Sequence, residues 1–169
     1  MLEINIDANG NAWFIENIKF ISSADEEIKA LDSLNTKTTV TLKADFASEI
    51  QSNYPRDSTA TISLTHYQAN EVSYKSTSNF NQFAVFSEIY YKEGWNAYID
   101  DELSTIYQVD YVLRGLEIPA GKHKIEFKFE PTVIKKGSNI ALVSYGLLLL
   151  IPLGWFLIEK RKAKNEPSQ

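Results

Sequence analysis

Acidic and histidine side chains are the first candidates for chemistry in this sequence. Asp100 and Asp101 are adjacent, so in a strand or turn their carboxylates diverge and could not flank a glycosidic bond. Glu88 and Glu93 lie near the same predicted hairpin, but nothing marks them as a pair. With no cysteine and two isolated histidines, we expect neither a metal site nor a cofactor. Catalysis within this chain therefore has little support, and an anchored hydrolase would require a suitably spaced carboxylate pair.

A dense group of aromatic residues is the stronger lead. Six of them fall within 22 residues, namely Tyr90, Tyr91, Trp95, Tyr98, Tyr107 and Tyr111. Flat rings with polar tips suit a surface that stacks on sugars, although the same residues also fill the cores of β-sandwiches. The candidate ligand-binding residues are Trp95, Tyr98, Asp100, Tyr111 and Arg114.

One short helix is predicted near the start of the chain. Ser23 and Glu26 have the spacing of a capping box, in which the serine accepts a backbone N–H and the glutamate reaches back. Ile28, Leu31 and Leu34 follow at intervals of three, which predicts an amphipathic helix of at most three turns.

The remainder of residues 1–134 alternates in the manner of strands. Residues 83–91 are more continuously apolar, which is typical of a central strand covered on both sides. Residues 123–130 alternate strictly, with Ile125, Phe127 and Phe129 on one face, as in a half-buried edge strand. Short strands about ten residues apart predict a mainly β fold, an antiparallel β-sandwich of jelly-roll or immunoglobulin-like type. The predicted strands are 39–43, 59–67, 71–75, 83–91, 95–99, 105–109, 111–118 and 123–130.

The charges of the chain are unevenly distributed. Over 169 residues the apolar fraction of 44% is ordinary, and a net charge of −5 argues against a nucleic-acid partner. Residues 135–169 hold 6 basic and 2 acidic residues, a net charge of +4. Residues 1–134 hold 11 basic and 20 acidic residues, a net charge of −9. The average composition therefore conceals two different parts.

Residues 140–158 form an uncharged run between two basic clusters. As a helix this run would be about 28 Å long, close to the thickness of a bilayer core. Tyr145 and Trp155 lie toward its ends, where interface anchors are common. We therefore predict a single C-terminal transmembrane helix with its flanks over 135–159, rather than a buried core helix or a sorting tail. The partner would be the lipid bilayer of the bacterial inner (plasma) membrane.

The basic residues also predict an orientation. The cluster after the run is the more basic, which places a cytoplasmic tail at 160–169 and an extracytoplasmic domain at 1–134. Residues 1–6 lack the basic and apolar regions of a signal peptide. We therefore expect this chain to be the C-terminal piece of a longer polytopic membrane protein, whose N-terminal membrane region is a further partner.

Several blocks of the sequence resemble the C-terminal region of YfhO-family bacterial membrane proteins, especially Bacteroidetes-type members. The opening Asn11-Ala-Trp-Phe-Ile15 is similar, and the resemblance is closer over the blocks at 84–91, 94–100, 111–121 and 123–131. It implies a part of a GT-C-like glycosyltransferase that uses lipid-linked sugars, with catalytic acids in an N-terminal loop outside this chain. Asp101 stands where the family commonly has glycine, so we expect this turn to differ in type.

Two functions follow as hypotheses. The first is a non-catalytic extracytoplasmic domain and membrane anchor of a YfhO-like protein, implicated in transfer of cell-envelope polysaccharide or lipid-linked sugar. The second is a stand-alone, membrane-anchored carbohydrate-binding module, with a glycan as its ligand.

Overall fold

The structure, a computed structural model, describes residues 8–164. Predictions for residues 1–6 and for residues 165–169 of the basic tail lie outside the described residues. The chain divides into two compact units, Met1–Glu130 and Pro131–Gln169, named here the β unit and the helical unit. The domain boundaries predicted after residues 134 and 159 stay predictions.

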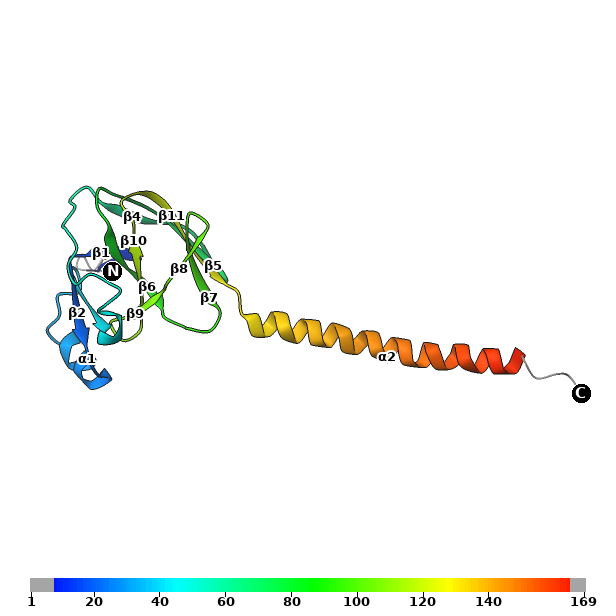
Figure 1. The fold of residues 1–169 in the computed structure, drawn as a ribbon. Coiled ribbons are helices and arrows are strands. Elements are labelled where there is room, and N and C mark those ends of the chain that lie inside the picture. The colour runs from blue at the N-terminus through cyan, green and yellow to red at the C-terminus, as the bar shows by residue number, and fades with distance from the viewer. Residues whose placement is uncertain (1–7, 165–169) are drawn as a thin grey trace, which may run out of the picture. The chain divides into compact units, whose positions relative to one another are not determined.

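The described part of the β unit contains eleven strands, one α-helix and one 3₁₀ helix (Figure 1). Their bounds are β1 Ala12–Ile15, β2 Asn17–Ile21, α1 Ala24–Leu31, β3 Thr39–Lys43, η1 Ala44–Phe46, β4 Thr61–Gln68, β5 Glu71–Ser78, β6 Gln82–Ile89, β7 Trp95–Ile99, β8 Glu102–Ser104, β9 Tyr107–Val109, β10 Leu113–Ile118 and β11 Gly121–Phe129. The helical unit contains α2, Thr132–Lys164.

The strands form two sheets that pack face to face. Sheet A has the order β1-β6-β10-β9-β3-β2, and sheet B has the order β4-β5-β11-β7-β8. Phe86 and Leu116 of sheet A meet Tyr74, Ile125 and Phe127 of sheet B in one buried cluster. The rings of Phe86 and Phe127 lie 4.8 Å apart, edge to face, across this interface. The prediction of a mainly β, two-sheet fold is confirmed.

Sheet A is covered on both faces. The side chains of β6 alternate between two cores, with Ala84 and Phe86 facing sheet B and Phe83 and Val85 facing the second core. The second core lies among β2, β3, β9 and the segment that carries Tyr54. The apolar run at 83–91 is therefore explained as predicted, because β6 is a central strand that is buried on both sides.

The backbone at Gly115 lies in close contact with two side chains of the second core. A Cβ atom at this position would lie 2.6 Å from two atoms of the Phe83 ring and 2.8 Å from Val109 Cγ1. Glycine is therefore required because Phe83 occupies the space of a side chain.

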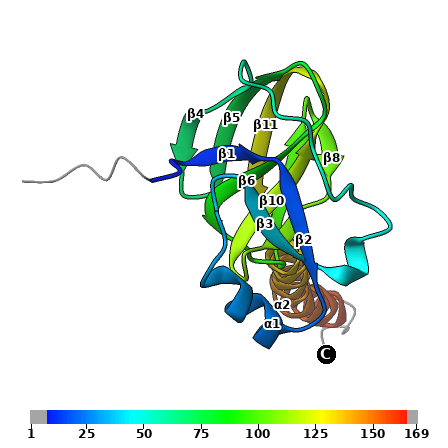
Figure 2. The same ribbon diagram turned by 90° about the vertical axis from the view of Figure 1, so that its left-hand side faces the viewer.

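Two predictions about the strands are wrong. Strand β11 is not an edge, since it pairs with β5 on one side and β7 on the other. Its outward Glu126 is buried between the ammonium groups of Lys124 and Lys128, 3.0 and 3.4 Å away. The sandwich is also not wholly antiparallel, because β2 and β3 pair in parallel, side by side in Figure 2.

Helix α1 begins as the capping box predicts. The Glu26 backbone N–H donates to Ser23 Oγ at 3.2 Å, and Glu26 Oε2 accepts from the Ser22 backbone N–H at 2.8 Å. The predicted apolar face is wrong, because Ile28 is half exposed whereas Glu27 is buried. Glu27 is drawn inward by buried hydrogen bonds to residues of β3 and the β9–β10 turn.

The predicted C-terminal transmembrane helix is wrong. Helix α2 runs from Thr132 to Lys164 and so takes in basic residues on both sides of the uncharged run. Among the helices whose residues the structure describes, none combines the length and apolar character needed for a membrane crossing.

Candidate binding sites on the β unit

Arg114 and Trp95 are brought together between the sheets. Arg114 is only 3% exposed, and its guanidinium carbon lies 4.3 Å from the centre of the Trp95 ring. Its Nε donates to the Ile89 carbonyl at 3.0 Å, while Nη1 is buried with no hydrogen-bond partner among the described atoms. Desolvation lowers the pKa of Arg114. The cation–π contact fixes the indole ring, so this pair is primarily part of the packing.

Tyr98 and Asp100 lie on the opposite face of sheet B. Side chains alternate along β7, so Trp95, Ala97 and Ile99 face inward while Tyr98 faces outward. The Tyr98 hydroxyl donates to Glu130 Oε2 at 2.7 Å, and this hydrogen bond raises the pKa of Tyr98. One ligand could not contact the Trp95 and Tyr98 rings together through this strand.

The Asp100 carboxylate is occupied by neighbouring groups. Its Oδ1 accepts from the Lys124 backbone N–H at 2.8 Å, and its Oδ2 lies 2.6 Å from His123 Nδ1. The backbone hydrogen bond, followed by that of His123, lowers the pKa of Asp100, and the same carboxylate raises the pKa of His123. These contacts give Asp100 a role in closing the β7–β8 hairpin onto β11.

The turn at Asp100 and Asp101 is of type I′, which corrects the expectation that aspartate would change the turn. Both residues have positive φ, 49° and 70°, and Ile99 pairs directly with Glu102. We predict that Asp101→Gly raises the free energy of unfolding by about 0.5 kcal/mol, because relief of left-handed strain exceeds the entropy gained by the unfolded chain. Thermal unfolding measures this, with Asp101→Ala expected to melt below the wild type. A lower Tm for the glycine variant than for the wild type would contradict the prediction.

Tyr111 is separated from the other candidates and held by a buried polar network. Asp110 and Tyr111 both have positive φ, 45° and 68°. The Tyr111 backbone N–H donates to Glu27 Oε1 at 2.8 Å, and the Thr41 backbone N–H donates to Asp110 Oδ1 at 2.8 Å. The Thr41 hydroxyl lies 3.0 Å from Glu27 Oε1 and 3.1 Å from Asp110 Oδ1. This network fixes a turn that would otherwise be strained.

The network predicts a pH dependence of stability. One hydroxyl proton on Thr41 can be donated to only one of its two carboxyl neighbours, and burial raises the pKa of Asp110. Because the pKa of Asp110 is raised in the folded state, protonation of its carboxyl group stabilises the fold. This stabilisation is complete below the ordinary aspartate value, 3.8, and is lost as pH rises through the folded-state pKa. We expect the stability of Asp110→Asn relative to the wild type to increase over that window. A difference that is flat with pH in urea unfolding would contradict this.

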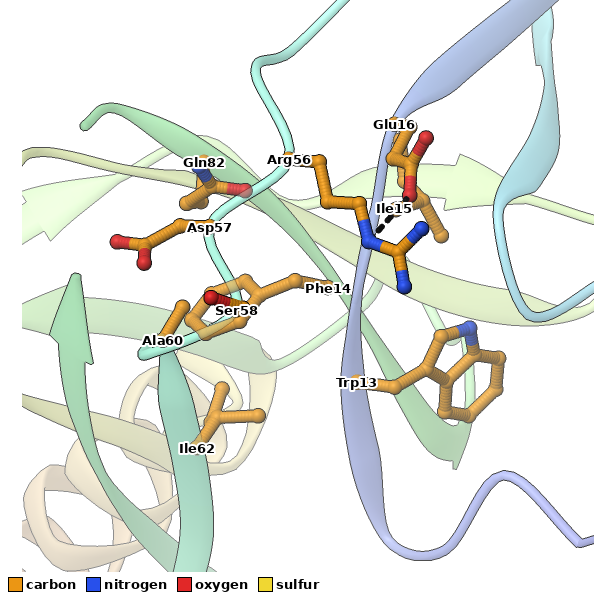
Figure 3. A pocket seen from close by; sticks show the side chains of 10 residues that line it. All are labelled: Trp13, Phe14, Ile15, Glu16, Arg56, Asp57, Ser58, Ala60, Ile62 and Gln82. Carbon is orange, nitrogen blue, oxygen red and sulfur yellow. Dashed lines mark ion pairs between the residues drawn. The ribbon is translucent and has the colours of Figure 1, made fainter. Parts of the chain in front are cut away.

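A groove at the sandwich edge holds residues that the sequence did not single out as a site. It has a volume of about 340 Å³ and lies between β1 and the segment leading into β4 (Figure 3). Figure 3 shows Arg56 reaching past β1 toward Glu16, with the Trp13 indole nearby. We name Trp13, Glu16 and Arg56, with the space they line, the edge groove. Only Trp13 had a sequence signal, within the block at 11–15.

The edge groove presents polar groups that are only weakly engaged. Arg56 Nε lies 3.7 Å from Glu16 Oε1, and the Arg56 side chain is 82% exposed. The Trp13 ring is held in place because its Nε1 donates to the Thr36 carbonyl at 2.8 Å. Asp57 also lines the groove, but its carboxylate accepts from Thr59 and Asn79, and these hydrogen bonds lower its pKa. An aromatic face beside one donor and one acceptor is suited to a sugar ring.

A smaller depression of about 190 Å³ lies beside Trp95 and includes Tyr90, Tyr91, Lys92 and Asn96. It contains part of the aromatic group noted in the sequence, but only Trp95 of the five predicted ligand-binding residues. In the part of the chain that the structure describes, no three His, Asp or Glu side chains are grouped as metal ligands.

A comparison with known protein families relates the chain to bacterial membrane proteins. The family model described as "Bacterial membrane protein YfhO" matches residues 32–141, which is 110 of the 169 residues. The chain therefore belongs to the YfhO family. No curated protein and no solved structure matches it. The narrower resemblance to Bacteroidetes-type members stays a prediction.

Proposed function

We propose that this chain supplies a non-catalytic accessory domain to a YfhO-family membrane protein implicated in transfer of cell-envelope polysaccharide or lipid-linked sugar. The family match over residues 32–141 is the observation that carries the proposal. It spans most strands of both sheets, so the family relationship belongs to the β unit itself. The domain would position an acceptor or support the membrane region of the same protein.

The arrangement of the acids supports a non-catalytic role. Asp100 is bonded to His123 and Lys124, and Glu126 lies between two lysines. Asp110 is buried in the network beneath Tyr111. Each of these carboxylates has a structural role, and this role explains its position without a catalytic function.

Sugar transfer in membranes of cells that express the parent protein tests the proposal. A catalytic carboxylate would cost about 100-fold or more in rate when neutralised. We expect Glu88→Gln, Glu93→Gln and Asp101→Asn to leave incorporation of labelled sugar within about twofold of the wild type, whereas deletion of residues 1–130 impairs it. A loss of about 100-fold in a folded carboxamide variant would assign catalysis to this chain.

We further infer that residues 1–134 lie outside the cytoplasm. Their net charge of −9 supports this location, because basic rather than acidic segments are retained on the cytoplasmic side. Protease treatment of intact spheroplasts is expected to degrade residues 1–134. Protection of residues 1–134 from the protease would contradict this location.

Glycan binding is the second candidate function, and the edge groove favours it. Sugar rings are recognised by aromatic stacking together with donors and acceptors for neighbouring hydroxyls, which Trp13, Arg56 and Glu16 offer. The mixed charge of Arg56 and Glu16 suits a neutral sugar better than an anionic one.

Arg56→Ala provides the test of this candidate, because the side chain is exposed and its loss should not affect folding. We expect affinity for a bound neutral glycan to fall about tenfold with an unchanged Tm, as for removal of a charged hydrogen-bond donor. Lys122→Ala removes the same charge from an exposed position on β11, away from the edge groove, and is the matched control. Glycan-array binding that is absent, or insensitive to Arg56→Ala, would remove the candidate.

A further inference from the structure

One end of the β unit carries exposed apolar side chains on three separate segments. They are 42% to 72% exposed and comprise Ile28, Ile89, Tyr91, Tyr111 and Val112, named here the end patch. The Tyr111 backbone N–H is bonded to Glu27 of α1, and the Tyr90 backbone N–H donates to the Val112 carbonyl at 2.7 Å. These two bonds join the three segments into one surface.

Hydrogen bonds beneath the end patch hold part of its backbone in a strained conformation. Tyr111 adopts a left-handed conformation, φ 68°, that an aromatic residue rarely occupies. Buried contacts of Glu27, Thr41 and Asp110 hold the backbone of this turn, while the Tyr111 side chain remains 42% exposed. Strain held in place beneath an exposed aromatic side chain is typical of functional surfaces.

The chain leaves the sandwich at the same end. Strand β11 ends at Phe129, which pairs with Trp95 at the start of β7. The Glu130 backbone N–H then donates to the Gly94 carbonyl, in the loop that carries Tyr91. Phe80, by contrast, is half exposed at the other end, between the last residue of β5 and the first of β6.

We propose that the end patch contacts the headgroup–acyl boundary of a lipid bilayer. The family is one of membrane proteins, so a bilayer accompanies its members. Exposed tyrosine rings with aliphatic neighbours match the chemistry of that boundary, where rings lie at headgroup level and aliphatic groups reach the acyl chains. The inference concerns only the β unit and is independent of the proposed accessory role.

The charges near the end patch specify the kind of lipid contact. Lys29 and Lys92 follow Ile28 and Tyr91 directly, but Glu88 lies near the end of β6 and Glu93 lies on the same loop as Tyr91. This mixture gives little net attraction to anionic headgroups. Contact with the bilayer should therefore depend on apolar insertion and be nearly insensitive to salt.

The absence of cysteine from the sequence allows a direct test in the full chain. Ile89→Cys, Val112→Cys and the control Phe80→Cys would each carry an environment-sensitive fluorophore, in vesicles of phosphatidylethanolamine and phosphatidylglycerol. We expect spin-labelled lipid to quench the labels at 89 and 112 but not at 80, and aqueous iodide to show the reverse. All three positions are exposed, so folding should be retained. A companion Tyr111→Ser substitution should reduce lipid quenching at 112 severalfold.

Three results would contradict the inference. Equal access of iodide to all three labels would show that the end patch faces water. Labels shielded from iodide without quenching by spin-labelled lipid would show that protein, such as a second copy of the chain, covers the patch. Lipid quenching that disappears at high salt would contradict apolar insertion as its cause.

Discussion

Gly115→Ala should lower the free energy of unfolding of the β unit by about 3 kcal/mol, at the upper end of the usual cost of overpacking. The added methyl group would lie 2.6 Å from two atoms of the Phe83 ring and 2.8 Å from Val109 Cγ1. Neither neighbour is a flexible chain end, since Phe83 and Val109 are both fully buried. The ring can retreat only by disturbing Tyr54 and Tyr107, which lie 5.9 and 6.0 Å from it.

Urea unfolding monitored by tryptophan fluorescence measures this loss. A Trp155→Phe background leaves Trp13 and Trp95, both in the β unit, as the reporters. Gly146→Ala is the matched control, because a Cβ at Gly146 in α2 meets no atom within 4 Å. The control should leave the unfolding of the β unit unchanged.

A second substitution distinguishes this clash from a general intolerance of alanine at position 115. Phe83→Leu shortens the side chain that occupies the space, so its effect and that of Gly115→Ala should be non-additive, with part of the loss recovered in the double variant. Additive losses, or a loss below about 1 kcal/mol for Gly115→Ala alone, would show that the core adjusts freely around the methyl group.

The requirement for glycine at 115 also shows how far the sequence predicts this fold. Local alternation located eight of the eleven strands of the described β unit and missed β1, β2 and β8. The apolar run at 83–91 correctly indicated a doubly covered strand. Alternation could not distinguish an edge strand from a central strand with one solvent face, which is why β11 was misplaced. The close contact of Gly115 with Phe83 joins residues 32 positions apart, and no local pattern predicts it.

The candidate sites likewise combine features that the local sequence predicts with features that depend on distant parts of the chain. Aromatic density singled out Trp95 and Tyr98 together, but the pleat of β7 turns Tyr98 to the other face of sheet B, and binding at Trp95 stays a prediction. Arg56 and Glu16 are 40 residues apart and approach only because the segment before β4 passes β1. Glu27 likewise points inward because its carboxylate accepts hydrogen bonds from Thr41 and Tyr111, which lie far along the chain.

Glu27→Ala should destabilise the β unit by about 2 kcal/mol, because it leaves a partly buried backbone donor without its acceptor. That donor is the Tyr111 backbone N–H, 2.8 Å from Glu27 Oε1, whereas the Thr41 hydroxyl can still donate to Asp110 Oδ1 at 3.1 Å. Glu27→Gln retains a side-chain oxygen at this position and should cost about 1 kcal/mol or less. Urea unfolding in the Trp155→Phe background gives both values.

Glu26→Ala is the neighbouring control, since Glu26 is exposed and bonds only to the helix start through the Ser22 backbone N–H. Its loss should be about 1 kcal/mol, as for a helix cap. Hydrogen exchange separates the two effects, because Glu27→Ala should deprotect the amide of Tyr111 while Glu26→Ala leaves it protected. If Glu27→Ala cost no more than Glu26→Ala and Tyr111 remained protected, the strained turn would be held by Asp110 and Thr41 alone.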